Sequence, residues 1–478
     1  MYFNSILYIF GFLPVVITIY FILNKFKILL CGKLWLILAS LVFYAWFNIK
    51  YLYFFIVYLF INYAFYYFIK KFRNDKKSKI LLVSAITFNL FILGVFKYFN
   101  FFIDSINLVL KTNFPLVEIF LPLAISFQTL QQIGFLKDTI DDEKINYNFI
   151  DYCLFFVFFP QLIVGPIVKH SETIPQFNNL RKKLFSHKNF IIGLAIFLIG
   201  FYKKGFIVAP LNAEIFSKIG LISSMCTPEA WLFSIMEYFH IYLDISSYMD
   251  MAIGSALMLN INLPINFNSP MFAKNIGDFW QRWHITFARF MKNYVYEPLK
   301  LINPKEYFIN FSIILTCFLG GLWQGASFLA ILWGCFHGLG FLINRYWGKL
   351  NIKLPDFITI PITFLFVSVL GMFLRLTSIQ DLGLFYSKLF SWTNLTDISV
   401  NIQEVTFNIG SDQHSWALKP VLFCLIGIIF IILRISVEGK DLAKFVKPNL
   451  LWALILAIGI VELIYFYSPP TGFLYYNF

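Results

Sequence analysis

Residues 5–23 read SILYIFGFLPVVITIYFIL and contain no charged side chain. About 20 consecutive apolar residues are enough for an α-helix to cross the hydrocarbon core of a bilayer. The run lacks the positively charged leading segment of a cleavable signal peptide, and it is long enough to span. We therefore expect a transmembrane helix near the start of the chain.

The composition extends this expectation to the whole chain of 478 residues. Hydrophobic residues make up 59%, aromatic residues 21% and charged residues only 13%, whereas an ordinary globular protein carries roughly 25% charged residues. A soluble protein this apolar could not cover its surface with polar groups. The composition excludes a cytosolic enzyme, a disordered chain and a secreted disulfide scaffold, and it predicts an all-α polytopic membrane protein.

Apolar stretches of spanning length recur along the chain and predict about 11–13 transmembrane or re-entrant helices. They are residues 5–23, 29–47, 51–69, 80–98, 115–135, 152–168, 190–209, 229–250, 309–330, 331–347, 357–375, 418–435 and 450–467.

The basic residues predict the orientation, because Lys and Arg collect in cytoplasmic loops. Residues 24–27 and 70–79 are basic and follow the first and third stretches, so the N-terminus is expected outside. Residues 169–188 are also basic, which requires the stretch 152–168 to enter the membrane and return. Residues 393–417 have acids but no Lys or Arg and fit an external loop. The net charge of +13 thus reflects loops and predicts no nucleic-acid partner.

The six cysteines form no CxxC pair and lie mostly in apolar stretches. They are interpreted as small buried hydrophobic residues, and no metal site is expected.

Residues 279–294 predict an amphipathic helix lying at the cytoplasmic interface. Aromatic and apolar residues recur at spacings of three and four and share one face: Trp280, Trp283, Phe287, Met291 and Tyr294. The opposite face, available to lipid phosphates, carries Arg282, Arg289 and Lys292. His284 falls at the edge of the apolar face and is expected to point into the protein or the membrane.

Ionisable groups at membrane depth are costly and suggest function. His240 shares an apolar segment with Asp244 and Asp250, and it is either a core histidine or part of a cavity. His337 lies among small residues that permit close helix packing, so it is either structural or functional. His187 and His414 lie in polar loops and are expected to be solvated. Spacing alone supports an intramembrane histidine site, and the two acids leave a transporter pathway open.

Seven motifs in order carry a more specific signal. They are 126–133 (SFQTLQQI), 159–167 (FPQLIVGPI), 242–254 (YLDISSYMDMAIG), 279–286 (FWQRWHIT), 294–299 (YVYEPL), 321–326 (GLWQGA) and 333–338 (WGCFHG). Together they closely resemble the membrane-bound O-acyltransferase family, and most nearly its bacterial branch of alginate and peptidoglycan O-acetylation proteins. The resemblance covers roughly residues 120 to 345.

This resemblance implies a helical bundle with re-entrant segments around a central tunnel. It implies N-terminal helices over 1–115, a catalytic core over 116–347 and C-terminal helices over 348–478. The family's activity is acyl transfer, with a thioester donor from the cytoplasm, here acetyl-CoA, and no bound cofactor. The acceptor is a polysaccharide hydroxyl, reached directly or through a periplasmic SGNH-type acetyltransferase, and the location is the bacterial cytoplasmic membrane.

The family's two polar site residues carry over to positions 284 and 324. His284 matches the earlier one, but Gln324 stands where a histidine is expected. Gln cannot act as a base near neutral pH. Three readings follow: His284 is the base and Gln324 orients the acceptor or binds the oxyanion; His337 substitutes, which needs a helix break near Gly334; or the chain binds without transferring. The residues expected to line the tunnel are Trp280, Trp283, Trp323, Asp244 and His240.

Two other functions stay open at this stage. A transporter or exporter of a glycan or small solute would often show two matching halves, and no such duplication is visible. A catalytically silent docking subunit differs from the enzyme only at Gln324. The acceptor is not identified either, since peptidoglycan, alginate-like uronans, cellulose and other wall glycans would give similar motifs, as would D-alanyl transfer in a sister branch.

Overall fold

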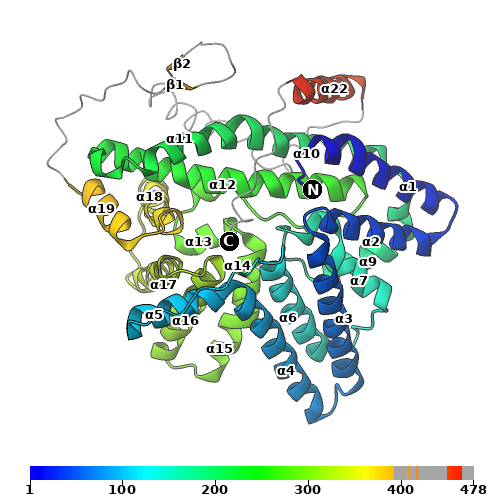
Figure 1. Ribbon diagram of the computed structural model, residues 1–478, viewed down its shortest axis with the longest axis horizontal. Coiled ribbons are helices and arrows are strands. Elements are labelled where there is room, and N and C mark those ends of the chain that lie inside the picture. The colour runs from blue at the N-terminus through cyan, green and yellow to red at the C-terminus, as the bar shows by residue number, and fades with distance from the viewer. Residues whose placement is uncertain (392–405, 408–415, 418–448, 466–478) are drawn as a thin grey trace.

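The computed structural model describes residues 1–391, 406–407, 416–417 and 449–465 (Figure 1). Its regular structure is helical apart from one antiparallel pair of two-residue strands, β1 (Thr406–Phe407) and β2 (Trp416–Ala417). The predicted all-α class is therefore confirmed.

The elements before residue 220 are mainly α-helices, with π-helical turns η1, η2 and η4. Their order is η1 (Leu7–Phe12), α1 (Leu13–Lys25), α2 (Leu29–Ala45), α3 (Ile49–Lys71), α4 (Lys76–Leu93), η2 (Gly94–Tyr98), α5 (Phe99–Leu110), α6 (Ile125–Asp141), α7 (Phe149–Val157), α8 (Phe159–Leu162), α9 (His170–Asn178), η3 (Leu180–Lys183), α10 (His187–Tyr202), η4 (Lys203–Val208) and α11 (Ala209–Ile219).

The elements after residue 220 include the longest helix, α12. Their order is η5 (Ile222–Ser224), α12 (Thr227–Met258), η6 (Pro270–Phe272), α13 (Ile276–Arg282), α14 (Ile285–Met291), η7 (Lys292–Tyr296), α15 (Glu297–Ile302), α16 (Glu306–Gln324), α17 (Phe328–Lys349), α18 (Asp356–Arg375), α19 (Ile379–Leu389) and α22 (Leu450–Tyr465).

Seven helical segments in the described part of the chain are long and apolar enough to cross a membrane, and α2 is a shorter apolar helix. The seven are Leu7–Lys25, Ile49–Lys71, Lys76–Leu110, His187–Ile219, Glu306–Gln324, Phe328–Lys349 and Asp356–Arg375. The protein is therefore a multi-pass membrane protein. The expected stretch 418–435 and most of the expected loop 393–417 lie outside the described residues.

Two predicted spans take a different form. Residues 112–124 are not helical but run back along α5, where Asn100 and Asn107 hydrogen-bond to the carbonyl groups of Val117 and Phe114. The helix begins only at Ile125, because the side-chain amides satisfy backbone groups that a helix would otherwise pair. The stretch 152–168 is also broken: α7 ends at Val157, and the chain turns within the protein through the short helix α8.

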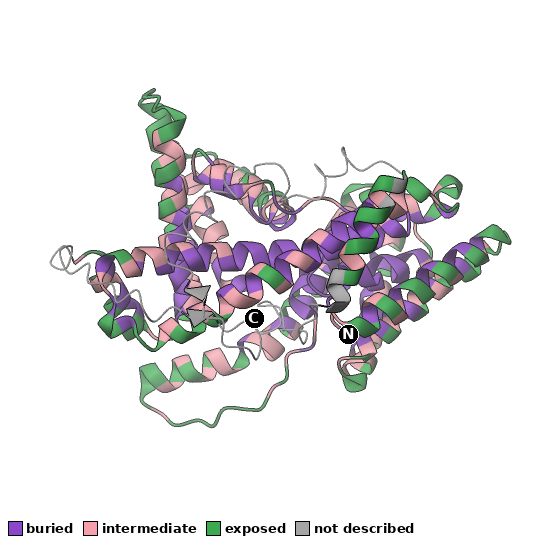
Figure 2. Ribbon diagram, turned by 90° about the horizontal axis from the view of Figure 1, so that it is seen from above, coloured by how far each residue is buried: buried purple, intermediate pink, exposed green. Residues whose placement is uncertain are grey.

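The long helix α12 forms the centre of the molecule, and most of its residues are buried (Figure 2). It packs against α10 with the two backbones in close contact. A Cβ atom at Gly254 would lie 2.5 Å from the carbonyl oxygen of Gly193, so only glycine fits at this crossing. Small residues allow such close packing of membrane helices. The predicted span 229–250 is therefore part of a buried central helix.

Helices α16 and α17 form a second closely packed pair. A Cβ atom at Gly321 would lie 2.3 Å from the carbonyl oxygen of Ala330, and one at Gly334 would lie 2.3 Å from that of Cys317. The chain turns between the two helices at residues 325–327. This turn places Gln324 at the end of one helix and His337 in the middle of the next.

Candidate active site

The predicted helix 279–294 is interrupted at His284, which corrects the sequence-based expectation. Helix α13 ends at Arg282, and α14 begins at Ile285. His284 lies between them with φ 43° and ψ 51°, in the left-handed region that non-glycine residues rarely occupy. Such strained residues persist where the surrounding structure holds them, and they cluster at functional sites.

Asn266, in the segment after α12, holds this interruption in place. Its Oδ1 accepts hydrogen bonds from the Thr286 N–H (3.0 Å) and the Thr286 hydroxyl (2.9 Å). Its backbone carbonyl accepts from the Ile285 N–H at 2.8 Å. Its Nδ2 lies 3.3 Å from Nδ1 of His284. The Asn266 side chain is 1% exposed, so the amide acts as a buried clamp on the histidine.

The orientation of this amide favours one tautomer of His284. A backbone N–H can only donate, so Oδ1 of Asn266 faces Thr286 and Nδ2 faces the ring. Nδ1 of His284 is then a hydrogen-bond acceptor, which places the proton of the neutral imidazole on Nε2. The hypothesis that His284 is a general base requires the other tautomer.

His284 is completely buried and is surrounded by aromatic rings. Its ring centroid lies 5.3 Å from that of Phe287, 6.2 Å from that of Phe127 and 6.2 Å from that of Trp323. Burial lowers the pKa of His284 to about 3, because the charged imidazolium loses its hydration. The ring is therefore neutral at physiological pH, and it lies inside the protein as the sequence indicated.

Two of the three basic residues expected to face lipid form ion pairs within the protein. Arg282 binds Asp278 at 2.7 Å. Arg289 binds both carboxylate oxygens of Glu172, at 2.5 and 3.0 Å. Lys292 is exposed, and it alone of the three remains as the expectation described it.

A small cavity of about 40 Å³ lies beside Phe127 and Trp323, two of the rings that contact His284. Its walls include Lys97, Ser126, Phe127, Trp323 and Gln324. The side chain of Gln324 is 4% exposed. The structure therefore places Gln324 and Trp323, both predicted site residues, at one enclosed hollow.

A large cavity of about 900 Å³ lies beside Phe287, the third of these rings, and its walls are mostly apolar. They include Trp280, Phe287, Trp333 and His337, with Lys292 among the charged residues. Trp280 donates a hydrogen bond from Nε1 to Nδ1 of His337 at 3.2 Å. His337 thus belongs to the large cavity, and Gln324 to the small one.

His284 lines neither cavity, but aromatic rings that line the two cavities contact it. Phe127 and Trp323 contact it and line the small cavity, whereas Phe287 contacts it and lines the large cavity. The Phe287 and Trp323 rings stack with centroids 4.5 Å apart. This arrangement does not support the substitution of His337 for the missing histidine, because the helix break at residues 325–327, not near Gly334, leaves His337 on the far side of these rings.

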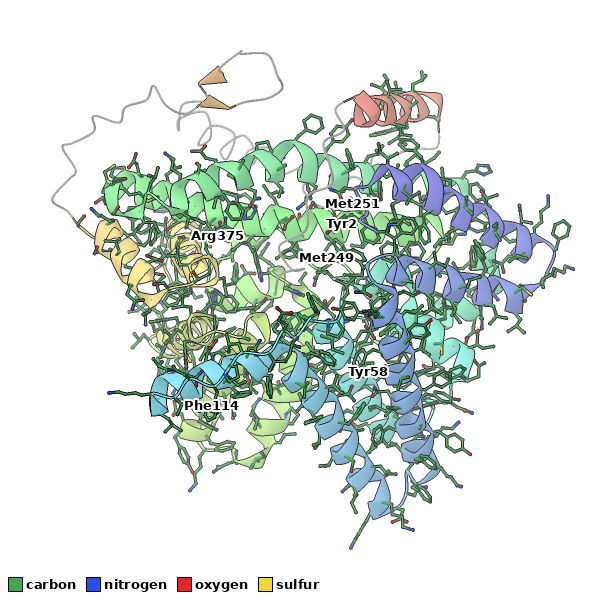
Figure 3. The ribbon with its side chains drawn as sticks, in the orientation of Figure 1. Tyr2, Tyr58, Phe114, Met249, Met251 and Arg375 are labelled. Atoms are coloured by element: carbon green, nitrogen blue, oxygen red, sulfur yellow. The ribbon has the colours of Figure 1, made fainter. Side chains whose placement is uncertain are left out.

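Three residues expected to line the tunnel line neither cavity. Asp244 is buried and paired with Lys204 at 2.6 Å. His240 lies 3.7 Å from Glu237, which lies 3.7 Å from Arg375 at the end of α18 (Figure 3). Trp283 packs against the ring of Phe279.

The sequence reasoning did not single out Asn266, Ser126 or Lys97 as site residues. Asn266 lies in an irregular segment with no pattern to mark it. Met249, on the inner side of α12, contacts its Nδ2 (Figure 3). Lys97 had a detectable signal, since it is a lysine within the apolar stretch 80–98.

Comparison with known proteins identifies the family of this chain. The family model for the membrane-bound O-acyltransferase family matches residues 139–379, a range that contains His284, Gln324 and His337. The chain is 36% identical to a peptidoglycan O-acetyltransferase of Helicobacter pylori, over 100% of this chain and 97% of that protein.

More distant relatives have related names. The chain is 32% identical to a probable alginate O-acetylase AlgI of Pseudomonas aeruginosa, over 82% of this chain and 75% of that protein. It is 28% identical to a teichoic acid D-alanyltransferase of Bacillus subtilis, over 51% of this chain and 65% of that protein. The transporter hypothesis loses its support, because Asp244 and Asp250 are paired with Lys204 and Lys203. This multi-pass chain belongs to the membrane-bound O-acyltransferase family and is an O-acyltransferase.

Proposed function

We propose that this enzyme transfers acetyl groups from acetyl-CoA to O-acetylate a cell-wall polysaccharide, and that it resides in the bacterial cytoplasmic membrane. The observation that supports the proposal is the position of His284, which is completely buried against aromatic rings that line a large apolar cavity and a small one. The names of the similar acetyltransferases of Helicobacter and Pseudomonas support acetyl as the group and a polysaccharide as the acceptor.

The large cavity suits the donor. Its mostly apolar walls match a thioester arm, and its charged residues include the exposed Lys292, whose charge favours the phosphates of coenzyme A. Helix α15, which follows Lys292, lies toward the same lower side of Figure 1 as the turn between α3 and α4. That turn contains the basic residues 70–79, which are expected in the cytoplasm.

The reaction that fits this site is attack of a hydroxyl oxygen on the thioester carbonyl carbon. A C–O bond forms, the C–S bond breaks, and the hydroxyl proton ends on the departing sulfur. Donors at the carbonyl oxygen stabilise the negative charge that develops there, most effectively where water is excluded. We assign this donor role to Nε2 of His284, because Asn266 favours the tautomer that carries the proton there.

A periplasmic partner of the SGNH type is part of the proposal. The small cavity, at about 40 Å³, is much too small for a sugar polymer. The acetyl group therefore leaves on a hydroxyl that reaches the rim of the site, and a separate periplasmic transferase places it on the polysaccharide.

The test replaces His284 with Ala in a strain that lacks paralogues, and it measures ester-linked acetate on isolated wall polysaccharide. We expect acetate to fall to background. His187→Ala is the matched control, because His187 is exposed at the start of α10, and it should leave the acetate unchanged. Wild-type acetate levels in His284→Ala cells would refute the assignment.

The donor and the transferred group are tested in vitro. Inside-out membrane vesicles supplied with labelled acetyl-CoA should release free coenzyme A and retain labelled ester, whereas right-side-out vesicles should not. Ester-linked D-alanine released from the wall is measured in the same cells. If His284→Ala cells lose this D-alanine but keep the acetate, the result instead favours the activity named for the Bacillus relative.

A further inference from the structure

Lys97 is a cation inside a membrane-spanning segment. It lies in η2, within the helical segment Lys76–Leu110. Its Nζ donates to the backbone carbonyl of Trp323 at 2.5 Å. Among the described residues, no carboxylate lies within 4.0 Å of this Nζ. This Nζ also lies 5.7 Å from the ring centroid of Trp323 and 6.0 Å from that of Tyr98. A cation at membrane depth is costly without an anion beside it, so the lack of a neighbouring carboxylate suggests an anionic ligand.

The fold holds this lysine at the small cavity. The π-helical turn η2 separates α4 from α5, and the neighbouring Tyr98 donates to the carbonyl of Leu322 at 2.8 Å. Lys97 and Tyr98 thus bind successive carbonyls of the last turn of α16, beside Gln324. The carbonyl of Trp323 uses one of the three donors of an ammonium group.

The N-terminus of α6 provides a second positive feature at the same cavity. Its N-cap residue, Ala124, has φ 70° and makes no side-chain capping bond. The first-turn N–H groups of an α-helix have no intrahelical acceptor, and they favour anions. Ser126, in this first turn, is 7% exposed, and its Oγ has no hydrogen-bond partner. Both residues line the small cavity with Lys97.

We propose that the small cavity, through Lys97, Ser126 and the N-terminus of α6, binds the oxygen of an acetyl-sized acyl group. The ligand chemistry is a small oxyanion, either the carbonyl oxygen of the transferred acetyl group as it becomes negative or the carboxylate of free acetate. This inference deepens the proposed function and rests on it.

The size of the cavity selects the group. A cavity needs a volume of about 10–15 Å³ to hold one water molecule. The volume of about 40 Å³ therefore accommodates roughly three heavy atoms. An acetyl group has three heavy atoms, and a butyryl group has five. Phe127 and Trp323 line this cavity and also contact the histidine ring, so the cavity adjoins the residues around His284.

Equilibrium binding tests the site without requiring turnover. Binding of labelled acetate to the purified full-length chain is measured in detergent micelles, and a chloride salt keeps the ionic strength constant. We expect unlabelled acetate to compete at least tenfold better than butyrate. Lys97→Met should lose the binding, Lys97→Arg should retain it, and Ser126→Ala should weaken it several-fold. Lys79→Met is the matched control on the same helical segment, because Lys79 is exposed.

Acetyl transfer by the same variants gives the second readout. Loss of one oxyanion donor costs about 10²–10³ in rate, so Lys97→Met should lower transfer at least 10²-fold, while Lys97→Arg and Lys79→Met stay within a few-fold of wild type. If Lys97→Met elutes as an aggregate, Ser126→Ala is tested in its place. Unchanged acetate binding by Ser126→Ala then overturns the proposal. Equal binding by wild type and a monodisperse Lys97→Met also overturns it.

The two proposals fail in different ways. If wild type binds acetate through Lys97 but transfers no acetyl group to polysaccharide, the proposed function is wrong and the oxyanion site stands. If wild type transfers acetyl and Lys97→Met does so equally well, the function stands and the oxyanion site falls.

Discussion

Nδ2 of Asn266 lies 3.3 Å from Nδ1 of His284 and connects two segments that the chain separates by eighteen positions. The same amide accepts two hydrogen bonds from Thr286, directly after the histidine. A residue in a sparsely populated backbone region costs about 1–3 kcal/mol. The contacts of Asn266 offset this cost, and they determine which ring nitrogen carries the proton.

Replacing Asn266 with Asp tests the donor role of His284. A carboxylate still accepts from Thr286 but also accepts from the ring, which moves the imidazole proton to Nδ1 and leaves Nε2 as an acceptor. If Nε2 must donate, acetyl transfer falls at least tenfold. Asn268→Asp, at an exposed position nearby, is the control. Transfer at or above the wild-type rate in Asn266→Asp would show that His284 is instead the base.

The low pKa of His284 predicts an unusual dependence on pH. Burial lowers this pKa from 6.5 to about 3, so the ring stays neutral well below pH 6.5 in the folded protein. We expect acetyl transfer to show no acid-side loss with a midpoint near 6.5. A midpoint at 6–7 that disappears in His284→Gln would contradict the burial of the ring.

The same pKa affects stability. Between pH 6.5 and about 3 the unfolded chain binds a proton at position 284 that the folded chain does not, so the free energy of unfolding decreases as the pH falls. By pH 5.5 the contribution is about 1.4 kcal/mol. Thermal unfolding in detergent at pH 7.5 and 5.5 should therefore show a smaller decrease for His284→Gln than for wild type. An identical decrease in the two proteins would refute this prediction.

Gln324 stands at the small cavity where the family resemblance predicts a histidine. We expect Gln324→Leu to lower acetyl transfer at least tenfold, because leucine removes every polar atom of the side chain. Coenzyme A release and wall acetate should fall together. If Gln324→His exceeds wild type, then glutamine is a weakened substitute and not a residue adapted to this enzyme.

Because α16 and α17 pack closely, we expect substitution of Gly321 to lower the thermal stability. A methyl group there would lie 2.3 Å from the carbonyl of Ala330, so Gly321→Ala must separate the helices at a cost of about 1–3 kcal/mol. Gly348→Ala is the control on α17, because a Cβ atom there meets nothing within 4 Å. We expect a lower thermal midpoint only for Gly321→Ala. Equal midpoints would mean that the helices separate without cost.

Sequence patterns predicted correctly those features that depend on neighbouring residues in the chain. A long uncharged run in a membrane forms a helix, because the helix pairs the backbone N–H and C=O groups that lipid cannot. The all-α multi-pass class therefore followed from residues such as 5–23. The position of His284 among aromatic residues correctly indicated a buried ring. Spacing alone was wrong for 279–294, because it assumes a continuous helix, and the Asn266 contacts that break the helix come from a distant segment.

Composition, periodic apolar runs and ordered motifs therefore determined the membrane class, the family and the candidates His284 and Gln324. Only the tertiary structure decided that Gln324 lines the small cavity, that His337 lines the large one, and that Asp244 is neutralised by Lys204. The physical reason is that a cavity or an ion pair is a relation between side chains far apart in sequence. The grouping of Lys97, Ser126 and Gln324 around one hollow exists only after four separate segments have packed.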